Sequence, residues 1–177
     1  MKVINTKLKD CYILEPTVFE DARGYFFESF NQNKFEELTG LNPTFLQDNQ
    51  SKSSYGVVRG LHQQTGGYAQ AKLVRVLEGK VLDVAVDVRE GSETYGEYVS
   101  VVLSEENKRQ LFIPRGFLHG FAVLSETATF FYKCDNVYNK ESEDGVHPLD
   151  ETLGIDWQIP VEEILLSEKD KQARSFQ

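Results

Sequence analysis

Apolar and polar residues alternate with a period of two along much of the chain, and this pattern predicts β-strands. The clearest case runs from Val81 to Val88. Its even positions are all Leu or Val, whereas its odd positions combine Val and Ala with Asp83 and Asp87. The segment KLVRVL at 72–77 predicts a second strand. Glu78-Gly79-Lys80 between the two predicts a hairpin turn.

Short strands dominate the remaining predicted elements. Runs rich in β-branched and aromatic residues, separated by polar or glycine-containing turns, are RGYFFESF (23–30), YVSVVL (98–103), QLFI (110–113), GFAVL (120–124) and TATFFYKC (127–134). Helical signals are limited to NKFEELTG (33–40), with an asparagine cap and Gly40 at its end, and to a short turn at SEKDKQ (167–172). The pattern predicts an all-β sandwich or barrel with a few short helices. With no repeat or linker, residues 1–177 are expected to form a single domain.

Composition and charge narrow the functional classes. The net charge of −9 disfavours binding to nucleic acid or to an anionic membrane. Cys11 and Cys134 have no metal-type spacing and are interpreted as reduced thiols, although one disulfide stays open. The N-terminus lacks the apolar core of a signal peptide, and no apolar run reaches transmembrane length. The expected location is the cytoplasm.

Only three histidines are present: His62, His119 and His147. The segment PRGFLH, which ends at His119, has the pattern P-x-G-x-x-H. This pattern resembles the second motif of the cupins, small β-barrels of the jelly-roll type. Metal-binding cupins use several histidines, but here Gln63 and Gln64 follow His62. The sequence therefore predicts no metal site and no cofactor. His147 is interpreted as a structural residue.

Six segments in the same order resemble the dTDP-4-dehydrorhamnose 3,5-epimerases. They are DARGYFFESF (21–30), QDNQSKSSYGVVRGLH (47–62), AQAKLVRVLEGKVLDVAVDVR (69–89), NKRQLFIPRGFLHGFAVLSETATFFYK (107–133), GIDW (154–157) and LSEKDKQA (166–173). The resemblance runs from about Phe19 to Ala173. It implies a cupin-like jelly-roll fold and an isomerase that acts on a dTDP-sugar.

Epimerisation beside a ketone needs a base, an acid on the opposite face and a cation or donor for the enolate oxygen. The resemblance implies that His62 is the base, oriented by Asp170, that Tyr132 is the acid, and that Lys72 stabilises the enolate. Histidine suits the first role because its unperturbed pKa lies near ~6.5. Two structural alternatives stay open. Asp170 fits a capping box opened by Ser167, and Tyr132 shares a strand face with apolar residues that indicate core.

The resemblance also implies a set of substrate-binding residues and a homodimer with exchanged strands. The binding positions are Arg23, Glu28, Gln47, Asn49, Arg59, Lys72, His119, Glu143 and Lys169. Arginine suits a diphosphate because its planar fork binds two phosphate oxygens at once.

Two segments depart from the family pattern. Residues 63–68 replace an aromatic, a glutamine and a proline-containing turn, and residues 145–149 lack a tryptophan-like run. Neither removes a predicted catalytic group, but both leave the sugar and the nucleotide less well specified. Four alternatives therefore stay open: a single-carbon epimerase, a 3,4-ketoisomerase, a non-catalytic sugar-binding cupin and a metal-dependent cupin oxygenase.

Overall fold

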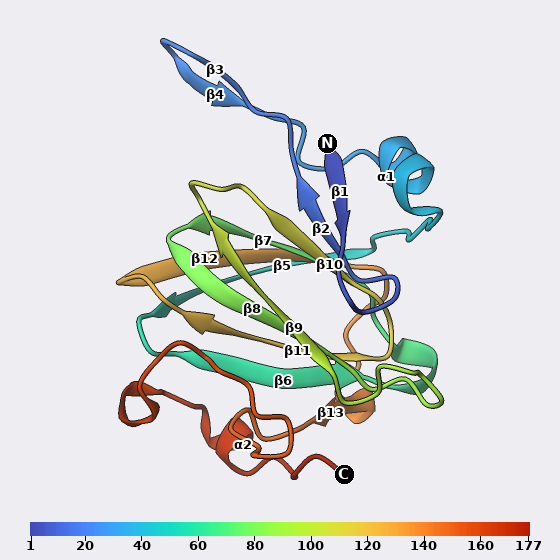
Figure 1. Ribbon diagram of the computed structural model, residues 1–177, viewed down its shortest axis with the longest axis vertical. Helices are drawn as coiled ribbons and strands as arrows, with labels where there is room; N and C mark the ends of the chain where they lie inside the picture. Colours follow the sequence, from blue (N-terminus) through green and yellow to red (C-terminus); the bar gives the residue numbers. More distant parts are fainter.

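The computed structural model describes all 177 residues, and its central part consists of two antiparallel sheets that face each other (Figure 1). The six-stranded sheet has the order β1 (Lys2–Asn5), β2 (Tyr12–Glu15), β10 (Gln110–Ile113), β7 (Lys72–Glu78), β12 (Thr127–Cys134) and β5 (Gln47–Ser54). The five-stranded sheet has the order β13 (Glu143–Gly145), β6 (Val58–Gln64), β11 (Phe117–Val123), β8 (Lys80–Asp87) and β9 (Tyr98–Ser104). The predicted all-β, jelly-roll fold class is confirmed, although hydrogen bonds do not close the sheets into one barrel.

The helices are few and short, as predicted. They are α1 (Gln32–Thr39), α2 (Glu168–Lys171) and the 3-10 turns η1 (Gly66–Tyr68), η2 (Lys140–Ser142) and η3 (Val161–Glu163). Helix α1 begins after Asn31, whose side chain accepts a hydrogen bond from the Lys34 amide, and ends at Gly40 in the left-handed conformation. The strand predicted at 23–30 is shorter in the structure, where only β4 (Gly24–Phe26) is extended and pairs with β3 (Phe19–Asp21).

The hairpin predicted at Glu78-Gly79-Lys80 is wrong, because β7 and β8 belong to different sheets. β7 pairs with β10 and β12, whereas β8 pairs with β9 and β11. The chain turns the corner at Gly79, where φ is 78° and a Cβ would lie 2.1 Å from the carbonyl oxygen of Thr127. Alternation shows that each strand has an apolar face. It does not show whether two strands pair within one sheet or belong to two sheets that pack face to face, because both arrangements bury the apolar faces.

The main core fills the space between the sheets and ends where the inward positions become polar. Phe121 of β11 and Phe130 of β12 stack across it with ring centroids 4.2 Å apart. Phe130 also lies beside His119 and Tyr132, at centroid distances of 6.0 Å in each case. Because aromatic contacts of this kind fix ring orientation, the end of the core holds two of the predicted site residues in place.

The β3–β4 hairpin projects away from both sheets (Figure 1). Phe19, Tyr25 and Phe26 on it are 63%, 59% and 69% exposed. Apolar side chains gathered on one exposed element are typical of a surface that another chain covers. None of the helices is long and apolar enough to span a membrane.

Candidate active site

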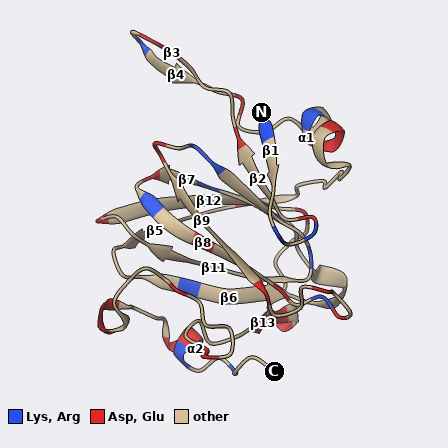
Figure 2. Ribbon diagram, in the orientation of Figure 1, with Lys and Arg blue, Asp and Glu red and all other residues tan.

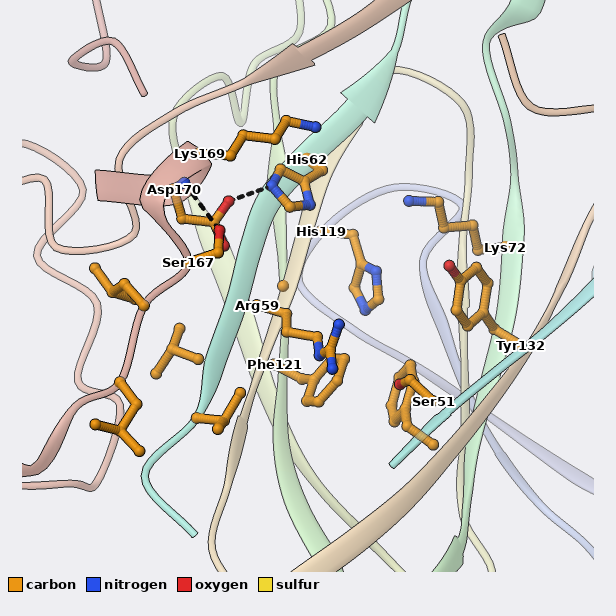
Figure 3. A pocket seen from close by; sticks show the side chains of 16 residues that line it. Ser51, Arg59, His62, Lys72, His119, Phe121, Tyr132, Ser167, Lys169 and Asp170 are labelled. Atoms are coloured by element: carbon orange, nitrogen blue, oxygen red, sulfur yellow. Dashed lines mark hydrogen bonds and ion pairs between the residues drawn. The ribbon is translucent and has the colours of Figure 1, made fainter. Parts of the chain in front are cut away.

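A pocket of about 460 Å³ opens beside the end of the core. Strands of both sheets and the C-terminal segment line it (Figure 3). Its polar lining consists of Ser51, Arg59, His62, Lys72, His119, Tyr132, Ser167, Lys169 and Asp170. The four residues predicted to be catalytic therefore meet in one cavity, although they come from distant parts of the sequence.

His62 and Asp170 form a hydrogen-bonded pair on one wall of the pocket. The Nε2–H of His62 donates to Oδ1 of Asp170 at 2.6 Å, and the two side chains are 35% and 4% exposed. Burial raises the pKa of Asp170, but the bond from His62 and further donors outweigh it, so that this pKa lies below its usual range. An ionised carboxylate only accepts hydrogen bonds, so in the neutral imidazole Nε2 carries the proton and Nδ1 has the free lone pair.

Asp170 also takes part in the cap predicted at Ser167. Its backbone amide donates to the Ser167 hydroxyl at 3.1 Å, which begins α2. In a capping box the acidic side chain would return to the amide of the cap residue, whereas the carboxylate of Asp170 points to His62 (Figure 3). The backbone of Asp170 thus serves the cap, and its side chain serves the histidine.

Tyr132 and Lys72 lie on the opposite wall, on neighbouring strands of the six-stranded sheet (Figure 3). Tyr132 pairs with Val74 and Cys134 pairs with Lys72, so that Tyr132 and Lys72 face the same side. Burial raises the pKa of the Tyr132 hydroxyl. Burial lowers the pKa of the Lys72 ammonium, against the attraction of the carboxylates of Asp83 and Glu143. The wall therefore presents a protonated hydroxyl beside the amine of Lys72.

His119 lies between the walls and has a carboxylate partner of its own. Its Nε2 lies 2.8 Å from Oδ1 of Asp83, and the two side chains are 7% and 0% exposed. Burial lowers the pKa of His119 and raises that of Asp83, while their mutual attraction opposes both shifts. The second carboxylate oxygen of Asp83 has no hydrogen-bond partner. Both pocket histidines are thus already bound to carboxylates, and no group of three or more metal-ligating side chains is present.

Comparison with known proteins shows the family of this chain. A family model described as dTDP-4-dehydrorhamnose 3,5-epimerase matches residues 5–177. A Shigella flexneri protein of that name is 54% identical, with 99% of this chain and 96% of the relative covered. The chain belongs to the dTDP-4-dehydrorhamnose 3,5-epimerase family.

Solved structures of this epimerase family share the fold over nearly the whole chain. A dTDP-4-dehydrorhamnose 3,5-epimerase from Elizabethkingia anophelis is 65% identical with a TM-score of 0.96, covering 99% of this chain and 96% of that chain. A dTDP-6-deoxy-D-glucose-3,5-epimerase from Legionella pneumophila, solved in complex with dTDP-4-keto-L-rhamnose, is 51% identical with a TM-score of 0.94, covering 98% and 92%. The resemblance predicted from the sequence is confirmed, and the chain is an isomerase.

Two of the predicted binding residues, Arg59 and Lys169, line the pocket beside the catalytic candidates, and a third, Glu143, lies next to it as the partner of Lys169. The guanidinium of Arg59 donates from Nε and Nη2 to the Ser53 hydroxyl, at 3.1 and 3.0 Å. Lys169 forms an ion pair of 2.9 Å with Glu143 at the start of β13. Figure 2 shows a Lys or Arg segment on β6 and both charge signs on α2.

Gln47 and Asn49 lie on β5, beside the wall formed by Tyr132 and Lys72, rather than in the lining of the pocket. Asn49 pairs with Tyr132, and its amide reaches the sulfur of Cys134 at 3.7 Å. Gln47 donates to the Asn49 oxygen at 3.1 Å and accepts from the Tyr138 amide at 2.9 Å. Both are therefore close to the proposed acid without reaching the cavity.

Arg23 and Glu28 are not brought to the pocket within one chain of this epimerase. Arg23 lies on the projecting hairpin, where it donates to Asp21 at 2.6 Å. Glu28 accepts hydrogen bonds from Lys34 and Asn31 at the start of α1. Within one chain, neither residue reaches the candidate site.

Ser51 and Phe121 line the pocket and Asp83 is hydrogen-bonded to His119, but none of the three was predicted from the sequence. The sequence context of Asp83 could have identified it, because this carboxylate lies among Val and Ala on the mixed face of the 81–88 strand. A carboxylate at an inward strand position needs a hydrogen-bonding partner. The sequence context of Ser51 and Phe121 could not, since a serine on a polar strand and a phenylalanine in an apolar strand are ordinary.

Proposed function

We propose that the chain inverts C3 and C5 of dTDP-4-dehydro-6-deoxy-D-glucose and produces dTDP-4-dehydro-L-rhamnose without a metal or cofactor. The main support is that His62 and Tyr132 lie on opposite walls of one pocket, with Lys72 beside the tyrosine. A planar enolate between these walls would present one face to a base and the other to an acid. The dTDP-4-keto-L-rhamnose bound by the Legionella relative has the chemistry expected of the product.

Each inversion proceeds in two proton transfers. Nδ1 of His62 takes the proton from the carbon next to the ketone, and the electron pair of the C–H bond moves to the ketone oxygen. The Lys72 ammonium stabilises the enolate oxygen. The Tyr132 hydroxyl then protonates the opposite face of the carbon, and the C=O bond forms again. His62 releases its proton to solvent and the tyrosinate regains one, so that no group is consumed.

The electrostatics of the pocket support these roles. Asp170 fixes the tautomer of His62 and stabilises the imidazolium that forms. The raised pKa of Tyr132 keeps its hydroxyl protonated at neutral pH, as an acid requires. A sugar-binding protein without catalysis would have no use for a paired base and a buried acid facing each other.

The nucleotide site is proposed to include residues of a second chain. Arg59 and Lys169 stand at the pocket, whereas Arg23 and Glu28 lie on or next to the exposed hairpin arm. A homodimer that exchanges this arm would bring Arg23 and Glu28 to the partner's pocket, in the cytoplasm expected from the sequence.

Mixing two impaired variants, assayed at substrate concentrations well below KM, tests the exchanged arm. In an Arg23→Ala/His62→Ala heterodimer, one pocket has both an intact His62 and an intact Arg23. Activity should therefore rise well above that of either variant alone after mixing and subunit exchange. No recovery in a sample shown to contain heterodimer would place Arg23 in its own chain or outside the site.

The reaction itself is tested in deuterium oxide with dTDP-4-keto-6-deoxyglucose as substrate. Proton NMR should show deuterium at both C3 and C5, together with the signals of the L-rhamno product. Exchange at one carbon alone would identify a single-carbon epimerase. No exchange at either carbon, from protein that still binds dTDP, would indicate a sugar-binding protein.

A further inference from the structure

The segment 165–174, here called the strap, carries Asp170 across β6 to His62. Its first residue is fastened near the start of β6, where the Leu165 amide donates to Gly56 at 2.8 Å and the Val58 amide donates to Leu165 at 3.0 Å. Its last residue forms a parallel bridge with Val146, and the His147 amide donates to the carbonyl of Arg174 at 2.9 Å. Asp170 lies between these two attachments.

The C-terminal attachment also involves a side-chain network centred on Asp144. Arg174 donates to both oxygens of this carboxylate, from Nε at 3.2 Å and from Nη2 at 2.9 Å. Gln63 donates to the same carboxylate at 3.0 Å. Burial raises the pKa of Asp144, but the bonds from Arg174 and Gln63 outweigh it and hold this pKa below its usual range.

Each member of this network is close in sequence to a part of the His62–Asp170 pair. Gln63 follows His62 on β6, and Asp144 precedes Gly145, which pairs with His62. A Cβ on Gly145 would lie 3.3 Å from the His62 ring, so β13 passes directly beside the base. Arg174 follows Asp170 by four residues and lies just beyond the end of α2. The Asp144 carboxylate on β13 therefore connects β6, which carries His62, with the strap, which carries Asp170.

The strap needs such an attachment because α2 has only four residues. A helix this short has no stability of its own in water, so its position depends on what holds its ends. The strap supplies a short hydrogen bond, with 2.6 Å between the carboxylate of Asp170 and the imidazole of His62. A displacement of about 1 Å in a catalytic contact can lower a rate by as much as ~10²-fold.

We propose that Arg174 is a positioning residue whose bidentate ion pair with Asp144 holds the strap so that Asp170 stays in contact with His62. This inference rests on the proposed role of Asp170 in orienting the base. Arg174 does not line the pocket, so its removal is expected to lower kcat by about tenfold and to leave KM for the dTDP-sugar unchanged.

The test variant is Arg174→Met, which keeps most of the side-chain volume and removes the charged fork. Arg109→Met is a matched control, because Arg109 pairs with Glu15 at 2.8 Å with exposures of 43% and 29%, against 52% and 27% for Arg174 and Asp144. Amide hydrogen exchange should become faster in the 165–174 peptide of Arg174→Met and stay unchanged there in Arg109→Met. Unchanged exchange in both variants would overturn the proposal whatever the activities are.

The same substitution in an Asp170→Asn background separates positioning from other routes. If Arg174 acts through Asp170, Arg174→Met should lower kcat in the wild-type background but have no further effect in Asp170→Asn. Arg174→Lys, which keeps the charge but not the fork, should recover part of the loss. Equal losses in the two backgrounds would overturn the proposal. A fully active Asp170→Asn would instead remove the proposed role of Asp170, and the positioning role with it.

Discussion

The two walls of the pocket are built in different ways. The wall with Tyr132 and Lys72, here called the acid wall after the proposed role of the tyrosine, consists of adjacent, hydrogen-bonded strands. Strand register positions its two groups, with Tyr132 opposite Val74 and Lys72 opposite Cys134. The wall with His62 and Asp170, here called the base wall, combines a strand with a four-residue helix from a distant part of the chain. Its geometry depends on the Asp170–His62 bond and on the attachments of the strap.

This difference shows how one pocket can hold both a group that donates a proton and a group that accepts one. Burial in a sheet keeps the Tyr132 hydroxyl protonated, because the pKa is raised where the anion loses hydration. The base wall is more open, and the carboxylate of Asp170, supplied from outside the sheet, lies 2.6 Å from the imidazole of His62. Substitutions on the base wall should therefore affect proton abstraction, and those on the acid wall should affect its delivery.

The largest effect is expected from removing the base. His62→Ala leaves no group with a suitable pKa at the reacting carbon, so solvent exchange and inversion should fall together at C3 and C5. General-base removal costs ~10² to 10⁴-fold. Proton NMR in deuterium oxide measures both rates. Exchange at the wild-type rate in His62→Ala would place the base on another residue.

A smaller effect is expected from the cations that bind the diphosphate. Arg59→Ala, Lys169→Ala and Arg23→Ala should each weaken dTDP binding by roughly 1.5 to 3 kcal/mol, the typical value of a charge-assisted hydrogen bond. Calorimetry with dTDP measures this without any turnover. Unchanged affinity in all three variants would show that these residues are only solvated.

Asp170→Asn should lower the rate less than His62→Ala, because it disturbs orientation without removing the base. Since the pKa of Asp170 is lowered on folding, its contribution to stability is present above about pH 3.9 and is lost as pH falls through the folded pKa. The difference in Tm between wild type and Asp170→Asn should therefore shrink under acidic conditions. Full activity with a small, pH-independent loss of Tm would leave Asp170 only its capping role.

The smallest effect, none at all, is expected from chelation. His62 and His119 are each hydrogen-bonded to a carboxylate, and the proposed mechanism uses no metal. Activity after dialysis against EDTA should equal that of untreated enzyme. Loss of turnover on chelation, with recovery on adding zinc, iron or nickel, would contradict the mechanism.

The sequence pattern predicted the acid wall better than the base wall. Alternation in TATFFYKC placed Tyr132 on the same face as Phe130 and Cys134, and the structure has this face inward. No periodicity connects His62 with Asp170, because the strap reaches β6 through tertiary contacts; only the family resemblance linked the two residues. The corner at Gly79 escaped prediction for a related reason, since alternation identifies a strand without identifying its partner.

The separation of acid from base is tested most directly by Tyr132→Phe. This variant keeps the ring and its packing but removes the proton donor. His62 should still take a proton and return a deuteron to the same face, so that deuterium enters the substrate while inversion falls by ~10² to 10⁴-fold. A structural tyrosine would instead lose about 1 kcal/mol of stability, with exchange and inversion changing together. The decisive quantity is the ratio of exchange to inversion. If Tyr132 is the acid, this ratio should increase greatly in Tyr132→Phe, whereas a wild-type ratio with both rates near normal would exclude Tyr132 from the mechanism.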